Sequence, residues 1–339
     1  MNNNIENIIK CIKGKKVVFV STKNKDYIRN TQEINLLTGE AEHCEVIASG
    51  SSSYVKRVLY VYWHLLRTLI KKRYDVIFIG FAPQLLLPFY AFMKKPVIID
   101  FFISMYDTFV DDRKKVKAGS VIAGILHSMD KYVLKKADHI VCDTRAHRDY
   151  FVDEFGEDQS KFNVYYLEAD TSIYSSAACA EKKSNTGKFN VLYFGSILPL
   201  QGVDVILKAA HKLQDEDEIK FVIIGPLEKK YDEVKRKMKN TEFIDWLPQQ
   251  ELAKKIMEAD LCLAGHFSGT IGKANRTIAG KTYIYKAMKK PVILGDSAAN
   301  RELFEEDAKE NFYVPRGDAQ ALSDCIRKIY CMRNNGENV

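Results

Sequence analysis

The chain has 339 residues, longer than one ordinary hydrophobic core supports, which predicts two domains. Hydrophobic residues make up 46% and charged residues 28%, as in a folded soluble protein. The net charge of +7 is mildly basic, well below that of a protein with a polybasic tail. No stretch reaches about 18 uncharged apolar residues, so we expect no membrane-spanning helix. The N-terminus lacks the apolar core of a signal peptide, and seven cysteines without CxxC spacing indicate reduced thiols of a cytoplasmic protein.

The first half of the chain alternates short apolar runs with longer helical patterns. We predict strands at 16–20, 44–49, 75–80, 96–100 and 139–143, and helices near 54–72, 83–94, 118–136 and 145–155. Residues 170–190 are small and polar, without periodicity, and indicate a linker.

The alternation then restarts. We predict strands at 189–195, 220–225, 242–246, 261–265 and 291–295, and helices near 202–213, 228–239, 248–258, 280–288, 299–306 and 318–332. Alternating strands and helices indicate parallel sheets with right-handed crossovers. We therefore predict an α/β protein of two doubly wound, Rossmann-like domains, residues 1–170 and 189–339, joined by a linker at 171–188. Ligands of such domains lie at the carboxyl ends of strands, here in a cleft between the two domains.

Glycines mark two of these strand ends in the second domain. Gly195 ends a strand and Gly202 begins the next helix, where free N–H groups attract an anion, and Gly225 ends the following strand. The pattern also suits a plain strand-to-helix turn. It is neither GxGxxG nor a Walker loop, so it does not indicate NAD or ATP binding. Trp246 and Leu247 follow the next strand, where they suit either a nucleobase or core packing.

The order of these motifs resembles the C-terminal domain of the group 1 (family 4-like) glycosyltransferases: strand, glycines and helix, then VIIG, then WLP, then a cationic loop and KAMKKPVI. Two N-terminal stretches, VIIDFFISMYDTFVDDR and HIVCDTRAHRDYF, look like a subgroup of this family. The resemblance covers residues 75–325. It implies the GT-B fold, acceptor binding by the N-terminal domain, and binding of a nucleotide diphosphate sugar by the C-terminal domain, mostly with retention.

Two motifs of the family are altered here. Its phosphate loop has Gly-Arg followed by Lys-Gly, whereas the matching positions hold Gly195–Ser196 and Gln201–Gly202. With Pro291 as the register, its two glutamates, which have seven residues between them, correspond to Arg276 and Ile284. Both cations and the acidic pair are therefore missing.

Lys273, Arg276 and Lys281 form a positive group with no carboxylate near in sequence. A nucleotide diphosphate needs cations, and the resemblance implies that these three supply them. Arg276 suits a bidentate contact, and the two lysines act as point charges. We expect Arg276 and Lys281 to stabilise the departing diphosphate. The alternative is a solvated basic loop.

Asp296, Ser297 and Glu302 follow the last predicted strand of the cleft. Glu302 lies where the family pattern often has a glutamate on the nucleotide side, and we expect all three to contact the donor. Asp296 and Ser297 suit helix capping equally well.

In the first domain, Asp100 ends a strand, and Ser104, Tyr106 and Asp107 follow it. We expect this polar loop to hold the acceptor, with Asp100 or Asp107 as the first carboxylate to test as a base. The resemblance implies that the leaving phosphate can take the acceptor proton instead. No His or Asp cluster has metal-ligand spacing, so we predict no essential metal, and no cofactor beyond the donor.

The segment 54–72 is basic, aromatic and apolar. On a helix, Lys56, Arg57, His64, Arg67 and Lys71 fall within a stripe of roughly 100°. This composition suits peripheral contact with an anionic membrane, on the inner face if the acceptor is lipid-linked. The alternative is a helix packed on its sheet with a wet basic face.

We therefore expect a metal-independent, hexosyltransferase-like GT-B enzyme of cell-surface polysaccharide synthesis, with a glycan or lipid-linked glycan as acceptor and no nucleic acid partner. Two alternatives stay open. A GT-B sugar-nucleotide epimerase needs carboxylates around the anomeric centre, in which the cleft motifs are poor. A degenerate partner subunit would bind the nucleotide sugar without transfer.

Overall fold

The computed structural model describes residues 4–175, 187–307 and 309–334 of the chain. The chain divides into two compact units, Met1–Leu167 and Glu168–Val339. Of the predicted linker, residues 176–186 lie outside the described residues. Ile173 and Tyr174, at its start, pack in an apolar core of the second unit.

The first unit is built on a six-stranded parallel sheet of order β2-β1-β3-β4-β5-β6. Its strands are β1 (Lys16–Val20), β2 (His43–Ile47), β3 (Val76–Ile79), β4 (Val97–Asp100), β5 (His139–Cys142) and β6 (Phe162–Val164). Every residue of β3 and β4 is buried, because helices cover both faces of a parallel sheet. The carboxyl ends of neighbouring strands meet at one edge, which brings Asp100 and Asp143 into proximity.

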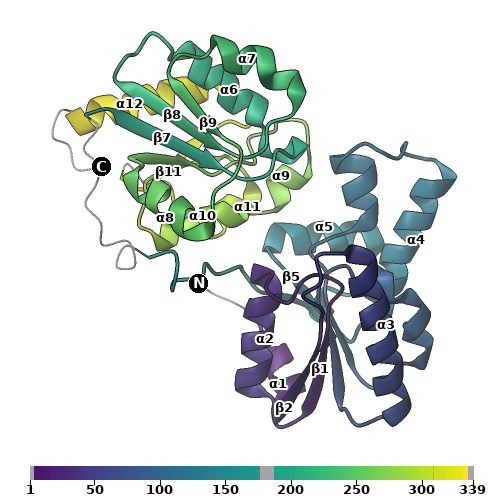
Figure 1. The fold of residues 1–339 in the computed structure, drawn as a ribbon. Helices are drawn as coiled ribbons and strands as arrows, with labels where there is room; N and C mark the ends of the chain where they lie inside the picture. The colour runs from purple at the N-terminus through teal and green to yellow at the C-terminus, as the bar shows by residue number, and fades with distance from the viewer. Residues whose placement is uncertain (1–3, 176–186, 308, 335–339) are drawn as a thin grey trace. The chain divides into compact units, whose positions relative to one another are not determined.

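Helices on the two faces of this sheet have different characters. They are α1 (Glu6–Ile12), α2 (Ile28–Glu40), α3 (Tyr54–Lys71), α4 (Val121–Lys136), α5 (Arg145–Phe155), the 3₁₀ helices η1 (Pro83–Phe92) and η3 (Gln159–Lys161), and the π-helical turn η2 (Asp107–Asp112). Figure 1 shows α1 and α2 on one face and α3 and α4 on the other. The helix η1 packs against both α3 and α4. In the described part of the chain, no helix is long and apolar enough to cross a membrane.

Among the differences between the first unit and the sequence predictions, three have a clear physical reason. The predicted helix at 83–94 is a 3₁₀ helix containing Pro83 and Pro88, which lack the N–H that an α-helix interior requires. Helix α4 begins at Val121, because the Ser120 side chain caps it. Helix α2 was not predicted, because its buried face carries polar residues, including Arg29 and Glu33, rather than an apolar stripe.

The second unit has its own six-stranded parallel sheet, of order β12-β11-β10-β7-β8-β9. Its strands are β7 (Phe189–Phe194), β8 (Ile219–Ile224), β9 (Thr241–Ile244), β10 (Leu261–Leu263), β11 (Val292–Gly295) and β12 (Asn311–Val314). The central strand β7 lies between β10 and β8, so the loops that follow β7 and β10 leave the same edge of the sheet side by side.

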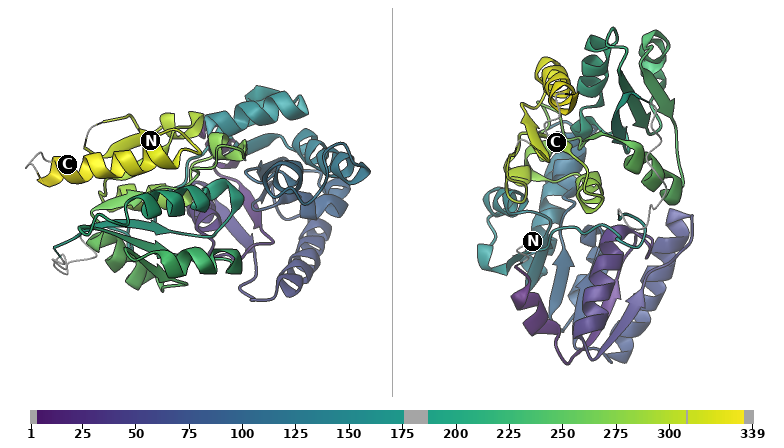
Figure 2. Two further views of the ribbon diagram at one scale, coloured as in Figure 1. Left: turned by 90° about the horizontal axis from the view of Figure 1, so that it is seen from above. Right: turned by 90° about the vertical axis from the view of Figure 1, so that its left-hand side faces the viewer.

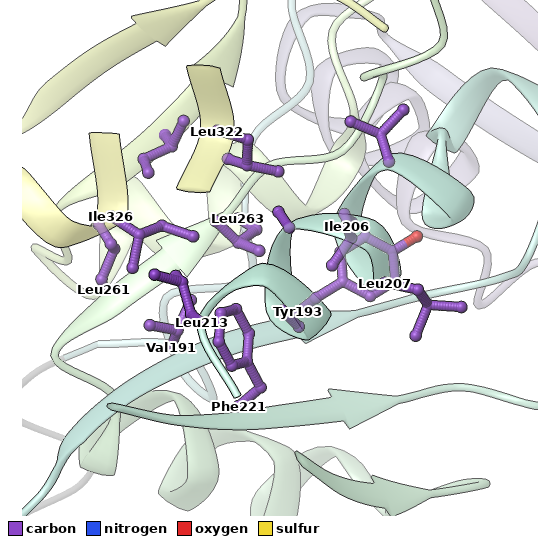
Figure 3. Close-up of a cluster of buried hydrophobic side chains, with 14 of the residues drawn as sticks. Val191, Tyr193, Ile206, Leu207, Leu213, Phe221, Leu261, Leu263, Leu322 and Ile326 are labelled. Atoms are coloured by element: carbon purple, nitrogen blue, oxygen red, sulfur yellow. The ribbon is translucent and has the colours of Figure 1, made fainter. Parts of the chain in front are cut away.

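Helices cover both faces of this sheet (Figure 2). They are α6 (Val203–Lys212), α7 (Asp232–Lys237), α8 (Gln249–Glu258), α9 (Lys273–Arg276), α10 (Gly280–Ala287), α11 (Ala298–Arg301) and α12 (Ala319–Asn334), with the 3₁₀ helices η4 (Pro199–Gln201) and η5 (Lys229–Tyr231). One face packs α6 against α12 over side chains that include Ile206, Phe221 and Ile326 (Figure 3). The other face packs α8 and α10, with Ile256 and Tyr285 buried. The prediction of two doubly wound parallel-sheet units is confirmed.

Candidate functional site

A buried cation lies at the carboxyl end of the second sheet. Lys281, in the first turn of α10, is only 7% exposed. Its Nζ donates a hydrogen bond to Gln201 Oε1 and lies 4.7 Å from the centroid of the Tyr193 ring. We call Tyr193, Gly195, Gln201, Gly265 and Lys281 the Lys281 cluster.

Glycines make room for the Lys281 side chain. A Cβ atom at Gly195 would lie 2.8 Å from Lys281 Cε, and one at Gly265 would lie 3.0 Å from Lys281 Nζ. Both glycines also have positive φ, +138° and +83°. The turns after β7 and β10 therefore close over the amine.

The charge of Lys281 is not neutralised. Among the described residues, no carboxylate forms an ion pair with it, and its hydrogen bond goes to the amide oxygen of Gln201. Burial lowers the pKa of the Lys281 amine to about 7, because desolvation penalises the charged form. A bound anion would supply the missing counter-charge, and the amine lies at the N-terminus of α10, where the helix dipole also favours an anion.

Two further glycines fix the backbone around the cluster. Gly202 begins α6 with φ +65°, and a Cβ there would lie 2.6 Å from backbone atoms of Phe267 and Ser268. Gly225 has φ +152°, and a Cβ there would lie 2.2 Å from the carbonyl oxygen of Gly195. Helix α6 has no side-chain cap, so its first N–H groups stay available to a ligand.

Replacing Gly225 by alanine is expected to destabilise the protein by about 3 kcal/mol, because the new methyl group meets the backbone of Gly195 and the φ angle is unfavourable for an L-residue. Urea denaturation measures this change. The matched control is Gly124→Ala in α4, where a Cβ meets nothing within 4 Å. That substitution should stabilise the protein by roughly 0.5–1 kcal/mol. An equal effect of the two alanines would contradict the argument.

The three cations predicted to act together are not equivalent. Lys273 and Arg276 are half-buried on the short helix α9, whereas Lys281 is buried. The Arg276 guanidinium lies back against Gly272, where a Cβ would be 3.0 Å from Nη1. The alternative of a fully solvated basic loop is therefore wrong for Lys281.

Sequence reasoning missed His266 and its contacts. His266 follows Gly265, is buried, and has φ +59°, which is uncommon for a residue other than glycine. Its Nδ1 lies 2.9 Å from the carbonyl oxygen of Thr277, and Thr277 Oγ1 donates to the carbonyl of Lys273. His266 thus joins the end of β10 to α9. The only sequence signal was a histidine directly after the predicted strand 261–265.

The polar residues after β11 are engaged in local structure. Asp296 forms a bidentate ion pair with Arg301, at 2.9 and 3.1 Å, and these hydrogen bonds lower the pKa of the Asp296 carboxyl. Ser297 caps α11 by accepting from the N–H of Asn300. Glu302 follows α11 and is half-buried. The capping interpretation therefore fits Ser297, and the Asp296 carboxylate already has a cationic partner.

The remaining donor-side predictions lie in two places. Ser196 is exposed in the turn after β7 and lies next to the Lys281 cluster in sequence. Trp246 and Leu247 follow β9, at the edge of the sheet and two strands from β7. Trp246 is 74% exposed, which excludes the core-packing alternative, whereas Leu247 packs against the core that contains α8 and α10.

In the first unit, Asp100 is bound by an arginine that the sequence did not reveal as its partner. Asp100 is completely buried, and Arg29 donates to its carboxylate from Nε at 3.1 Å and from Nη2 at 3.0 Å. Glu33 lies 3.4 Å from the same Arg29 Nε atom, and burial, with the nearby Asp100 carboxylate, raises the pKa of Glu33 well above the usual range. This pairing favours a structural role for Asp100 over a role as a base.

The polar loop after β4 is folded around another buried carboxylate, Asp130 of α4. Asp130 accepts hydrogen bonds from Ser104 Oγ at 2.7 Å, from the N–H of Tyr106 at 2.8 Å, and from the N–H of Met105 at 3.1 Å. Asp107 is buried at the start of η2, and its N–H donates to Ser104 Oγ. The Ser104 hydroxyl therefore serves the fold, and the Tyr106 ring, which contacts His127, is the more accessible group of this loop.

A histidine–aspartate pair lies at the end of β5. His147, on α5, is completely buried, and its Nδ1 is 2.7 Å from Asp143 Oδ1. The interaction with His147 lowers the pKa of the Asp143 carboxyl against the effect of burial. In the described residues, no group of three or more His, Cys, Asp or Glu side chains has the arrangement of a metal site.

Comparisons with known proteins agree with this architecture. Residues 188–331 match the family model described as glycosyl transferases group 1. No curated protein sequence matches the chain significantly.

Among solved structures, sucrose-phosphate synthase from Thermosynechococcus elongatus superposes with a TM-score of 0.68 at 10% identity, over 95% of this chain and 91% of that chain. HepE from Anabaena in complex with UDP gives 0.64 at 14% identity, over 95% and 91%. The lipopolysaccharide outer core galactosyltransferase WaaB in its apo form gives 0.60 at 10% identity, over 94% and 91%. These likenesses, with the two parallel sheets, confirm the predicted GT-B fold. Residues 188–331 are thus similar to the group 1 glycosyl transferases, and the whole chain has the GT-B fold.

Proposed function

We propose that this protein transfers a sugar, with retention and without a metal, from a nucleotide diphosphate sugar to a hydroxyl of a glycan or lipid-linked glycan. The observation that carries the proposal is the buried Lys281 amine, which has no carboxylate partner among the described residues. Such a cation beside glycine turns and an uncapped helix suits a diphosphate. The match of residues 188–331 to the group 1 family supports the same donor class.

We assign the diphosphate to Lys281, the α6 N-terminus and the turn at Gly195 and Ser196. Gln201 orients the Lys281 amine, and Arg276 and Lys273 contribute positive charge from α9. We assign the nucleobase side to Trp246, because its exposed ring is free of core packing. The positive side chains next to the departing diphosphate stabilise the negative charge that develops on it, and therefore stabilise the transition state more than the ground state.

The reaction breaks the bond from the anomeric carbon to the phosphate oxygen and forms a bond from that carbon to the acceptor oxygen on the same face. We propose that the departing phosphate oxygen takes the acceptor proton. Asp107 and Tyr106 of the first unit are the acceptor-side residues to test. The engaged carboxylate of Asp100 supports a mechanism without a protein base.

We also propose that the product is a cell-surface polysaccharide and that the enzyme works in the cytoplasm. The Lys281 cation suits the diphosphate of an epimerase substrate as well as that of a donor. The epimerase alternative is disfavoured because the cleft motifs are poor in the carboxylates that epimerisation needs near the anomeric centre. The degenerate-subunit alternative predicts binding without turnover.

Nucleoside diphosphates are expected to stabilise the folded protein, by about 2.7 kcal/mol at 100 times the dissociation constant. A thermal-shift panel of uridine, guanosine and thymidine diphosphates and their sugars measures this. Hydrolysis of the stabilising sugar donor without acceptor then tests for chemistry. Binding without hydrolysis or transfer would favour the degenerate subunit, and the absence of any nucleotide binding would reject the proposed function.

A further inference from the structure

One face of the first unit exposes apolar and basic side chains from three neighbouring elements. Tyr62 of α3 donates to the carbonyl of Leu85 in η1 and packs edge-on against Phe89. Gln84 of η1 donates to Asp130 of α4 at 2.6 Å. The elements α3, η1 and α4 thus form one layer on a single face of the sheet (Figure 1). We call the outer side of this layer the α3–α4 surface.

The solvent-exposed side of α3 carries large apolar residues as well as cations, unlike that of a helix that exposes only basic residues to water. Its inner positions, Val61, Leu65 and Leu69, are buried on the sheet. Four large apolar residues, spaced by four, three and four positions, remain exposed in a separate stripe. They are Leu59, Trp63, Leu66 and Ile70, the last of which is 70% exposed.

Helix α4 repeats this pattern, which its sequence did not suggest. Val121, Ile125 and Tyr132 lie on one side of the helix and are exposed, Val121 by 82%. With Leu87 of η1, they line a groove of about 610 Å³. Phe92, at the end of η1, is also exposed. Apolar exposure on adjacent elements of one face is unusual for a surface that contacts only water.

The charge on this surface is predominantly positive. Within Tyr54–Lys71, Pro83–Phe92 and Val121–Lys136, the only carboxylate residue is Asp130, which is buried. The exposed cations of the three elements and of the turn after η1 are Lys56, Arg67, Lys71, Lys94, Lys95, Lys131, Lys135 and Lys136. Three of these, Lys94, Lys95 and Lys136, line a depression of about 410 Å³ at one end of the surface, together with one carboxylate, Asp138, which accepts a hydrogen bond from the N–H of Val97.

We propose that the α3–α4 surface binds an anionic phospholipid bilayer, with its apolar side chains at the level of the acyl chains and its lysines at the headgroup phosphates. Basic residues beside exposed aromatic and aliphatic side chains match the two layers of such an interface. A second copy of the chain would bring like charges together in a twofold contact. A nucleic acid would leave Ile70 and Val121 without a favourable contact. This inference is independent of the proposed reaction.

The first test is sedimentation of the full chain with vesicles of phosphatidylglycerol or of phosphatidylcholine, without nucleotide. Binding is expected to phosphatidylglycerol vesicles and to weaken as salt is raised. Equal binding to both lipids, or no binding to either, would overturn the proposal. Because no donor is present, a failure here leaves the proposed function untouched, and the reverse also holds.

Substitutions then locate the contact. Ile70→Glu and Ile125→Glu, on different helices, should each weaken binding to phosphatidylglycerol vesicles roughly tenfold. The matched control is Val234→Glu, at an exposed apolar residue of the second unit. Lys94→Ala with Lys95→Ala should weaken binding about fivefold per lysine, whereas Lys10→Ala with Lys13→Ala, in α1 and directly after it on the opposite face, should not. Unchanged binding in both glutamate variants overturns the proposal, and circular dichroism checks that they fold.

A spectroscopic readout separates lipid insertion from other contacts. The chain has two tryptophans, Trp63 on α3 and Trp246. In Trp246→Phe, the emission of Trp63 should shift to shorter wavelength on phosphatidylglycerol vesicles, because the ring enters an apolar environment. An unshifted Trp63 contradicts insertion. Tight binding of duplex DNA without vesicle binding, or a dimer abolished by Ile125→Glu, would assign the surface to another partner and overturn the proposal.

Discussion

Replacing Lys281 by methionine is expected to lower the affinity for nucleoside diphosphates about 100-fold and to leave the affinity for nucleosides nearly unchanged. The reason is that Lys281 is a buried cation without a carboxylate partner among the described residues, so its counter-charge must come from the ligand. Methionine keeps the length of the side chain and removes the charge. Calorimetric titration with the nucleoside and its diphosphate measures both affinities.

The matched control is Lys286→Met on the same helix. Lys286 forms an ion pair with Glu310, so its charge is already compensated, and diphosphate binding should change little. Arg276→Ala should also weaken diphosphate binding selectively, but less than Lys281→Met, because Arg276 is only half-buried. An equal loss of nucleoside and diphosphate affinity in Lys281→Met would reject the phosphate role.

The same residue gives the stability a characteristic pH dependence. The folded pKa is about 7 and the ordinary value is 10.5, so between these values the unfolded chain binds one more proton than the folded one. The free energy of unfolding of the unsubstituted protein, measured relative to that of Lys281→Met, should therefore rise by a few kcal/mol as the pH is raised from about 7 towards 10. Diphosphate affinity should fall over the same range, because the free amine loses its proton. Melting temperatures of the two proteins at pH 7 and 9.5 test this sign.

Removing the buried arginine of the first unit is expected to have the largest effect on stability. Arg29→Ala leaves Asp100 buried without its cation and should destabilise the protein by about 3–5 kcal/mol. Arg29 also donates to the carbonyl of Tyr165, which would lose that partner. Urea denaturation measures the loss.

The chain offers a matched control for this pair. Arg301 makes a similar bidentate contact with Asp296, but on the surface, so Arg301→Ala should cost only about 0–1 kcal/mol. Similar losses in the two variants would contradict the argument from burial. Asp100→Asn separates the two roles of the carboxylate: a stable protein that has lost transfer activity would support the base that the geometry disfavours.

The sequence predicted the elements whose signal is local. Strand β1 and helix α3 lie almost where apolar runs and helical periodicity placed them. Helix α2 could not be recognised, because it buries polar residues instead of an apolar stripe. Their burial is possible because they form hydrogen bonds with groups at the ends of the neighbouring strands, as Arg29 does with Asp100. Because α2 was not predicted, Arg29 was not recognised as the partner of Asp100. The Asp100 carboxylate was therefore predicted to be free to act as a base.

The position of the candidate site could be predicted from the sequence, but not which of its cations is buried at its centre. The glycine turns and the cationic group were visible in the sequence, which assigned Arg276 and Lys281 the same role and Lys273 a supporting one. Only tertiary structure distinguishes Lys281, because its burial depends on Gly195 and Gly265 at two other strand ends. In the same way, sequence periodicity found the cations of α3 but not the exposed apolar stripe of α4, which depends on where η1 packs.

Asp130 gives the α3–α4 surface a mechanical property. Its carboxylate accepts hydrogen bonds from η1 and from three groups of the loop at Ser104–Tyr106, while its backbone belongs to α4. The Asp130 side chain thus connects three segments, α4, η1 and the loop at Ser104–Tyr106, through hydrogen bonds. A displacement of α4 at a membrane would therefore also disturb the hydrogen bonds of the loop that follows β4.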